Sequence, residues 1–327
     1  MLPETTYVPT SDGWRLALHH FPPRGERRRH PVLMVHGLGA NRLNIDLDER
    51  YSIARAARNR GYDVFLLELR GAGLSISPGG QDRTQFQWGF GEYALIDLPA
   101  AVQAVLGATG ATKLHGFGHS MGGMLWYALA TKRPQALRSI CTLASPLIGE
   151  LDLGARERRL LGLARRLAPQ VSPRRVPIRR VMGVAGHFVS VGSKLVDGIL
   201  LNAANTEPEV MARMAREAIA DIPLKLVLEI TQHMSNVRSP EGPFAYEQEL
   251  HRIDVPIYAM AGSGDRVAPP TSVQALVQRL SGPFVRHREM GRRFGDSADY
   301  GHADILVGRP APEEVFPLVL DFFDEVD

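Results

Sequence analysis

The stretch GFGHSMGG, at residues 116–123, holds a single serine between glycines in the pattern Gly118-x-Ser120-x-Gly122. An apolar run, KLHGFG, precedes the turn, and a helix-forming run, MGGMLWYALA, follows the serine. Small residues two positions before and after a serine allow a sharp strand-to-helix turn that exposes the hydroxyl. The alternative is that the glycines mark only a tight strand-to-helix connection and that Ser120 has no catalytic role. The pattern in this context predicts that Ser120 is a nucleophile.

A serine hydroxyl needs an imidazole to accept its proton and an acid to fix the tautomer of that imidazole. Where a serine lies on such a turn, the acid and then the histidine follow on loops after later strands. Asp265 in AGSGDRVAPP follows the apolar run VPIYAM, and His302 in DYGHADILVG lies beyond the last predicted strand. We predict Asp265 as the acid and His302 as the base. If Asp265 is only a turn residue, Asp299 or Asp304 is the next candidate.

Backbone amides near the serine are expected to bind the oxyanion that forms during acyl transfer. His36 and Gly37 open the sequence HGLG after the apolar run PVLMV, and we expect them to order that loop. The amide of Leu38 is then one donor, and the amide of Met121 is the other. His119 is adjacent to the serine, and we expect it to pack or hydrogen bond beneath the turn rather than act as the base.

Short apolar runs alternate with helical patterns, which predicts a parallel sheet with helices on both faces. Strands are predicted at 31–37, 62–69, 111–118, 137–145, 255–260 and 283–290, and helices at 50–60, 90–110, 121–134, 272–280 and 312–326. Residues 5–21 form two alternating runs around Ser11, Asp12 and Gly13, which predicts an antiparallel hairpin at one edge. Strand signals fade between 146 and 250. We therefore predict a core of residues 1–145 and 251–327 with an inserted helical cap at 146–250.

Five segments carry a family resemblance: VHGLGANR, LELRGAGLS, GFGHSMGG, AGSGDRVAP and YGHADILVG. In this order and spacing the sequence resembles the α/β-hydrolase fold. More narrowly it is similar to the lipase and esterase branch, including acid lipase-like and polyhydroxyalkanoate depolymerase or synthase-like relatives. The resemblance covers nearly all of the core and fades from Pro146 to Leu250, where that fold has its cap or lid.

The resemblance implies the same roles for Ser120, His302 and Asp265, with Leu38 and Met121 as oxyanion amides. It implies a serine hydrolase that cleaves carboxylic esters through an acyl-enzyme, without a cofactor. Related synthases use cysteine as nucleophile, so the serine favours hydrolysis over polymerisation. Haloalkane dehalogenases and epoxide hydrolases use aspartate at this position, so the serine also argues against those branches.

Other features refine this expectation. Glu68 in LELRG stands where relatives often have aspartate, and we expect it to pair structurally with Arg70. The leucine- and methionine-rich cap suggests an apolar acyl group. Acyltransferase, amidase or peptidase activity with the same triad is the alternative, and a noncatalytic binding protein is a further one.

Composition sets outer limits on function. The chain has 327 residues, of which 44% are hydrophobic and 22% charged, which is typical of a soluble globular protein. Its one cysteine, Cys141, excludes an intramolecular disulfide and lies in the run ICTLAS, so we expect a buried strand residue. No H-E-x-x-H motif and no apolar run of membrane-spanning length occurs. We expect no metal, no transmembrane segment and a cytoplasmic location.

The net charge of +3 is carried mainly by arginine, with a concentration between Arg156 and Arg180. Such a charge run is typical of solvated helix faces, but it would also suit phosphates, an anionic membrane surface or an acidic partner. Aromatic residues that would stack bases are not interleaved with it, which argues against nucleic acid. The sequence does not determine the oligomeric state.

Overall fold

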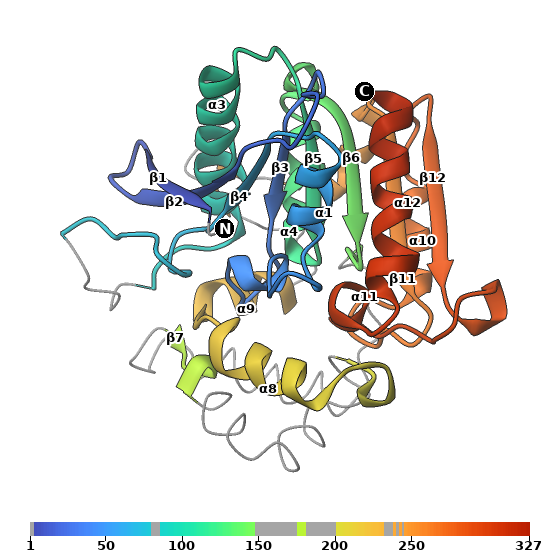
Figure 1. Cartoon of the computed structure of the whole chain (residues 1–327). Coiled ribbons are helices and arrows are strands. Elements are labelled where there is room, and N and C mark those ends of the chain that lie inside the picture. Colours follow the sequence, from blue (N-terminus) through green and yellow to red (C-terminus); the bar gives the residue numbers. More distant parts are fainter. Residues whose placement is uncertain are drawn as a thin grey trace.

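A single mixed sheet forms the centre of the molecule in a computed structural model of the chain (Figure 1). The structure describes residues 3–79, 86–147, 175–180, 201–231, 238–239, 242–243 and 245–327. Within these ranges, eight strands pair in the order β1-β2-β4-β3-β5-β6-β11-β12. They are β1 (Glu4–Pro9), β2 (Arg15–Phe21), β3 (Val32–Val35), β4 (Val64–Leu67), β5 (Leu114–His119), β6 (Leu137–Leu143), β11 (Ile257–Gly262) and β12 (Val285–Met290).

The amino-terminal edge of the sheet is antiparallel and the remainder is parallel. β1 and β2 form a hairpin, and β2 pairs antiparallel with β4. The hairpin turn contains Gly13 at a φ of 89°, a left-handed conformation that favours glycine. From β4 to β12 every neighbouring pair is parallel. The predicted parallel sheet and its antiparallel hairpin are both confirmed.

Helices cover both faces because the inner strands alternate their side chains between two apolar layers. Leu33 and Val35 pack in one buried cluster with α3 and α4, whereas Val32 and Met34 pack in the other with α1 and α12. All four side chains are fully buried, and each such burial stabilises the fold by roughly 1.5–3 kcal/mol. The covering helices are α1 (Ile53–Asn59), α3 (Leu98–Thr109), α4 (Met121–Ala130), α10 (Pro270–Val277) and α12 (Ala311–Val326).

Local capping explains where the helices differ from their predicted bounds. α1 begins at Ile53 because the Ser52 hydroxyl accepts a hydrogen bond from the Arg55 amide at 3.0 Å. The helix predicted at 90–110 consists of α2 (Phe90–Glu92), a π-turn (Tyr93–Asp97) and α3. It ends at Gly110, which has a φ of 71°. Cys141 is buried in β6, as predicted.

Two helices from the segment 146–250 lie beyond the carboxyl ends of the parallel strands (Figure 1). These are α8 (Pro208–Glu217) and α9 (Leu224–Thr231). Short elements accompany them: β7 (Arg175–Val176) pairs with β8 (Ile222–Pro223), and β9 (Arg238–Ser239) pairs with β10 (Gly242–Pro243). The arginines from Arg156 to Arg174 lie outside the described residues. In the described ranges, each helix is too short or too polar to cross a membrane.

Candidate active site

Loops at one edge of the sheet carry the residues predicted to do chemistry. Ser120 follows β5 directly, Asp265 follows β11, and His302 lies on the chain between β12 and α12. Since β5, β11 and β12 are strands of the same parallel region, their carboxyl ends meet at one edge. The topology therefore brings together side chains that are far apart in the sequence.

The three side chains form one hydrogen-bonded line. The Nε2 atom of His302 lies 2.9 Å from Ser120 Oγ, and its Nδ1 atom lies 2.8 Å from Asp265 Oδ2. The other carboxylate oxygen of Asp265 accepts the amides of Val267 and Ala268, each at 2.8 Å. With Nδ1 donating to the carboxylate, the Nε2 lone pair faces the serine hydroxyl. This is the arrangement in which an imidazole can accept the serine proton.

The backbone at Ser120 is strained in a way that presents its hydroxyl. Its φ of 54° is rare for a residue with a side chain, and its amide is held by the Leu143 carbonyl at 2.8 Å. A Cβ atom on Gly118 would lie 2.3 Å from a backbone nitrogen of α4, and one on Gly122 would lie 2.2 Å from a carbonyl oxygen of β3. Both positions therefore require glycine for close backbone packing.

Two backbone amides beside Ser120 are available to a ligand. Met121 is the first residue of α4, where helix geometry leaves the amide without an intrahelical acceptor. Leu38 lies in the loop after β3 and lines the same pocket as Ser120. Among the described residues, no acceptor contacts either amide. The start of α4 also directs the positive end of its dipole toward this point.

Buried polar side chains fix the HGLG loop (residues 36–39). His36 Nδ1 donates to the Gly37 carbonyl at 2.9 Å, and its Nε2 accepts the Leu69 amide at 3.2 Å. Burial lowers the pKa of His36, so the ring is neutral and can serve as donor and acceptor at once. The Asn44 side-chain oxygen accepts the Gly37 amide at 3.1 Å. These contacts agree with the ordering role expected for His36 and Gly37.

His119 lies beneath the serine turn. Its Nδ1 lies 3.0 Å from the Asn44 side-chain oxygen, and its Nε2 lies 2.9 Å from the His302 carbonyl oxygen. Burial, together with the nearby His302 ring, lowers the pKa of His119 to about 3. The neutral ring donates to one of these oxygens at a time. Asn44 Oδ1 thus lies between the Gly37 amide and the His119 ring, a position that sequence reasoning did not find.

The two reserve candidates for the acid have other partners. Asp304 is buried and accepts the side-chain amide of Asn205 at 2.8 Å. Burial raises the pKa of the Asp304 carboxyl. Asp299 accepts the Ser263 hydroxyl at 2.9 Å. Of the three aspartates, Asp265 is the one whose carboxylate contacts the His302 ring.

The expected pair of Glu68 and Arg70 is wrong. Glu68 lies 3.1 Å from His19 Nε2 and also accepts two backbone amides. Arg70 pairs instead with the buried Asp97 at 2.6 Å. The physical reason is that the Glu68 carboxylate accepts the Leu74 amide from the loop that follows it and the Arg42 amide from the loop after β3. The Arg70 guanidinium is then available to neutralise Asp97, a residue 27 positions away.

A mostly apolar pocket of about 130 Å³ opens at Ser120 and is called the serine pocket below. From α8 it receives Met211, Met214 and Ala215, which belong to the leucine- and methionine-rich segment expected to form the cap. The lining is Gly37, Leu38, Gly39, Ala40, Asn44, His119, Ser120, Leu201, Met211, Met214, Ala215, Ala218, Ile219, His302 and Ala303.

Comparison with known proteins supports the fold. A family model described as alpha/beta hydrolase fold matches residues 30–176, which include the HGLG loop and Ser120. The chain has the α/β-hydrolase fold. It is similar to a triacylglycerol lipase of Pseudarthrobacter phenanthrenivorans, with 34% identity over 36% of the chain and 33% of that lipase. It thus spans about a third of the length of the first curated relatives that it matches.

Solved structures resemble the whole chain. An esterase from Thermogutta terrifontis superimposes with a TM-score of 0.66 and 20% identity over 99% of both chains. A monoacylglycerol lipase from Paleococcus ferrophilus gives a TM-score of 0.65 and 18% identity over 95% of this chain and 99% of that one. At these identities the likeness establishes that the chain shares their fold.

Proposed function

We propose that this chain is a serine hydrolase that cleaves carboxylic esters through an acyl-enzyme. The observation that carries the proposal is the hydrogen-bonded line from Ser120 through His302 to Asp265. It lies beside two backbone amides that have no acceptor among the described residues. The similarity to lipases and esterases points to the same class of substrate.

In the proposed reaction, Ser120 Oγ attacks the ester carbonyl carbon while its proton passes to His302 Nε2. The carbonyl oxygen becomes an oxyanion, which the amides of Leu38 and Met121 stabilise, each by about 3 kcal/mol. When the intermediate collapses, the C–O bond to the alcohol breaks and His302 returns the proton to the departing oxygen. A water molecule, deprotonated by His302, then attacks the acyl carbon. The bond from that carbon to Ser120 Oγ breaks, the acid is released, and His302 returns the proton to the serine oxygen. Asp265 keeps the imidazole oriented and stabilises its positive charge.

We infer that residues 146–250 form a cap over a core made of residues 1–145 and 251–327. α8 belongs to this segment, and its methionines line the serine pocket opposite the HGLG loop. An antiparallel bridge between Ala40 and Ile219 joins the cap segment to that loop. The apolar wall from α8 suits the hydrocarbon part of an acyl group.

Labelling with a fluorophosphonate and turnover of a short aryl ester test the proposal together. Ser120→Ala should lose labelling and lower turnover by about 10⁶-fold, since the nucleophile of a triad accounts for a factor of this size. Ser281→Ala, which removes an exposed serine from the loop before β12, is the matched control and should retain both. Undiminished turnover in Ser120→Ala would refute the assignment. Transfer of the acyl group to an added alcohol in preference to water would indicate an acyltransferase instead.

A further inference from the structure

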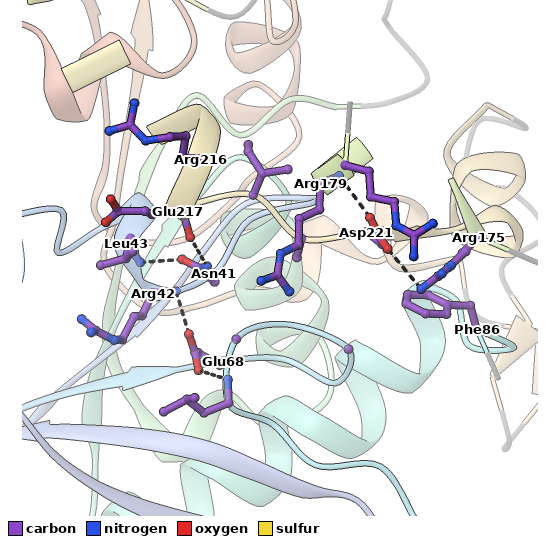
Figure 2. A pocket seen from close by; sticks show the side chains of 16 residues that line it. Asn41, Arg42, Leu43, Glu68, Phe86, Arg175, Arg179, Arg216, Glu217 and Asp221 are labelled. Atoms are coloured by element: carbon purple, nitrogen blue, oxygen red, sulfur yellow. Dashed lines mark hydrogen bonds and ion pairs between the residues drawn. The ribbon is translucent and has the colours of Figure 1, made fainter. Parts of the chain in front are cut away.

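A second pocket, of about 870 Å³, lies beside the serine pocket and is called the arginine pocket here (Figure 2). Its walls come from the loop after β3, the loop after β4, the segment 175–180, the end of α8 and the chain that follows it. They are Asn41, Arg42, Leu43, Glu68, Gly71, Gly73, Leu74, Phe86, Arg175, Arg179, Arg180, Arg216, Glu217, Ile219, Ala220 and Asp221. The volume is within the usual range for small-molecule sites, roughly 300–1,000 Å³.

The carboxylates of this pocket already have partners. Asp221 lies 3.3 Å from the Arg175 guanidinium and also accepts a backbone amide at 3.1 Å. Glu217 pairs at 3.1 Å with Arg213, which lies outside the pocket lining. Glu68 accepts two amides and contacts a histidine. The acidic groups are therefore engaged within the protein.

Positive charge is in excess. Five arginines and three carboxylates line the pocket, which leaves a net charge of +2. Arg42 pairs with Asp46 at 3.1 Å, and Arg175 lies over the Phe86 ring. The guanidinium groups of Arg179 and Arg180 are exposed and contact no carboxylate among the described residues. In Figure 2 the Arg179 side chain extends into the pocket. Planar guanidinium groups bind phosphate and carboxylate oxygens in pairs.

The arginine pocket and the serine pocket share a wall. Ile219 lines both, and it forms an antiparallel bridge with Ala40, which lines the serine pocket. On this bridge the Asn41 amide donates to the Ala218 carbonyl at 3.0 Å. The HGLG loop that carries the Leu38 amide thus has the serine pocket on one side and leads into the arginine pocket on the other. A ligand group held by these arginines would lie next to the reacting ester.

We propose that the arginine pocket binds a phosphate or carboxylate group on the alcohol half of the ester substrate. This rests on the proposed ester hydrolysis and narrows its substrate class to anionic esters. The apolar serine pocket takes the acyl group, and the arginines select the charged alcohol. The same chemistry would also bind a free anion, so the test separates these two sources.

Two esters with the same acyl group provide the test: 1-butyrylglycerol and 1-butyrylglycerol 3-phosphate. For the wild-type chain, kcat/KM should be at least tenfold higher for the phosphorylated ester. In the double variant Arg179→Gln, Arg180→Gln this ratio should fall to about one. A control with the same loss of charge, Arg24→Gln with Arg133→Gln, should keep the wild-type ratio, because these exposed arginines do not line the pocket. Thermal melting establishes that both variants are folded.

A wild-type ratio near one, or a ratio that persists in the double variant, would overturn the proposal. Titration calorimetry with inorganic phosphate examines the free anion. If phosphate binds through the arginines while both esters react equally, the pocket is an anion site and the substrate assignment is wrong. If neither ester is cleaved and the fluorophosphonate does not label Ser120, the proposed hydrolysis fails. Phosphate binding that is lost in the double variant would then still support an anion site, and absence of binding in the wild type would overturn it.

Discussion

Replacing Asp265 with asparagine tests the proposed triad, because it should change which nitrogen of the His302 ring carries the proton. One oxygen of this carboxylate accepts two backbone amides at 2.8 Å, and the other faces His302 Nδ1. An asparagine has one oxygen. Turning its NH₂ group toward the two amides would break both hydrogen bonds, at about 0.5–1.5 kcal/mol each. The side chain of the variant should therefore keep its oxygen on the amides and present NH₂ to the histidine.

That orientation reverses the role of the imidazole. Nδ1 must then accept a hydrogen bond, so the ring proton moves to Nε2, which lies 2.9 Å from Ser120 Oγ. A protonated Nε2 cannot take the serine proton. The expected loss of kcat is about 10⁴-fold, as for a wrong tautomer in other triads. At 1.36 kcal/mol per factor of ten, this corresponds to about 5.4 kcal/mol of activation free energy.

Steady-state hydrolysis of a short aryl ester measures the effect. Asp299→Asn is the matched control: Asp299 lies near the His302 loop but bonds to Ser263, and the variant should stay within twofold of wild type. The Asp265→Asn variant should melt close to the wild-type temperature, because its amide hydrogen bonds are retained. A folded Asp265→Asn enzyme with turnover within tenfold of wild type would refute the tautomer argument.

Two further predictions concern stability and use urea unfolding. Gly122→Ala would place a methyl group 2.2 Å from a carbonyl oxygen of β3 and should destabilise the fold by about 1–3 kcal/mol or more; an unchanged unfolding midpoint would contradict the packing argument. Burial alone would raise the pKa of Glu68, but the hydrogen bond with His19 and two amides hold it below its ordinary 4.5. Such a carboxylate stabilises the fold above the pKa of the unfolded chain and loses this contribution as the pH falls. Glu68→Gln should therefore reduce the free energy of unfolding more at pH 7 than at pH 4. An equal reduction at both pH values would contradict a stabilising role for the ionised carboxylate.

The fold could be predicted from the sequence, and so could the meeting of the site residues at one edge of the sheet, because both depend on strand order. Each predicted site residue follows an apolar run, and parallel strands place all such positions at one edge. The sheet, the hairpin and the covering helices are confirmed. The glycines beside Ser120 could also be recognised in the sequence, because close backbone contacts at these positions leave no room for a side chain.

Side-chain pairing between distant segments could not be predicted. Arg70 pairs with Asp97 rather than its neighbour Glu68, because only the fold shows which carboxylate is buried beside it. A further example is Asp327, at the end of α12, which contacts both His30 and His115. These histidines lie where β3 and β5 begin. The sequence suggested no cluster of histidine and aspartate, since these residues are 212 or more positions from Asp327. No local pattern encodes such a meeting.

The two halves of the proposed site obey different constraints. Around Ser120 the backbone packs so closely that the glycine positions are fixed by the fold, which is why short motifs identify them. The side chains of Arg179 and Arg180 are exposed and line an open pocket, where packing does not dictate residue type and a bound substrate can. Loss of the Asp265 carboxylate should therefore lower turnover of neutral and anionic esters by the same factor. Loss of Arg179 and Arg180 should instead change the ratio between the two, so the two kinds of variant separate chemistry from substrate choice.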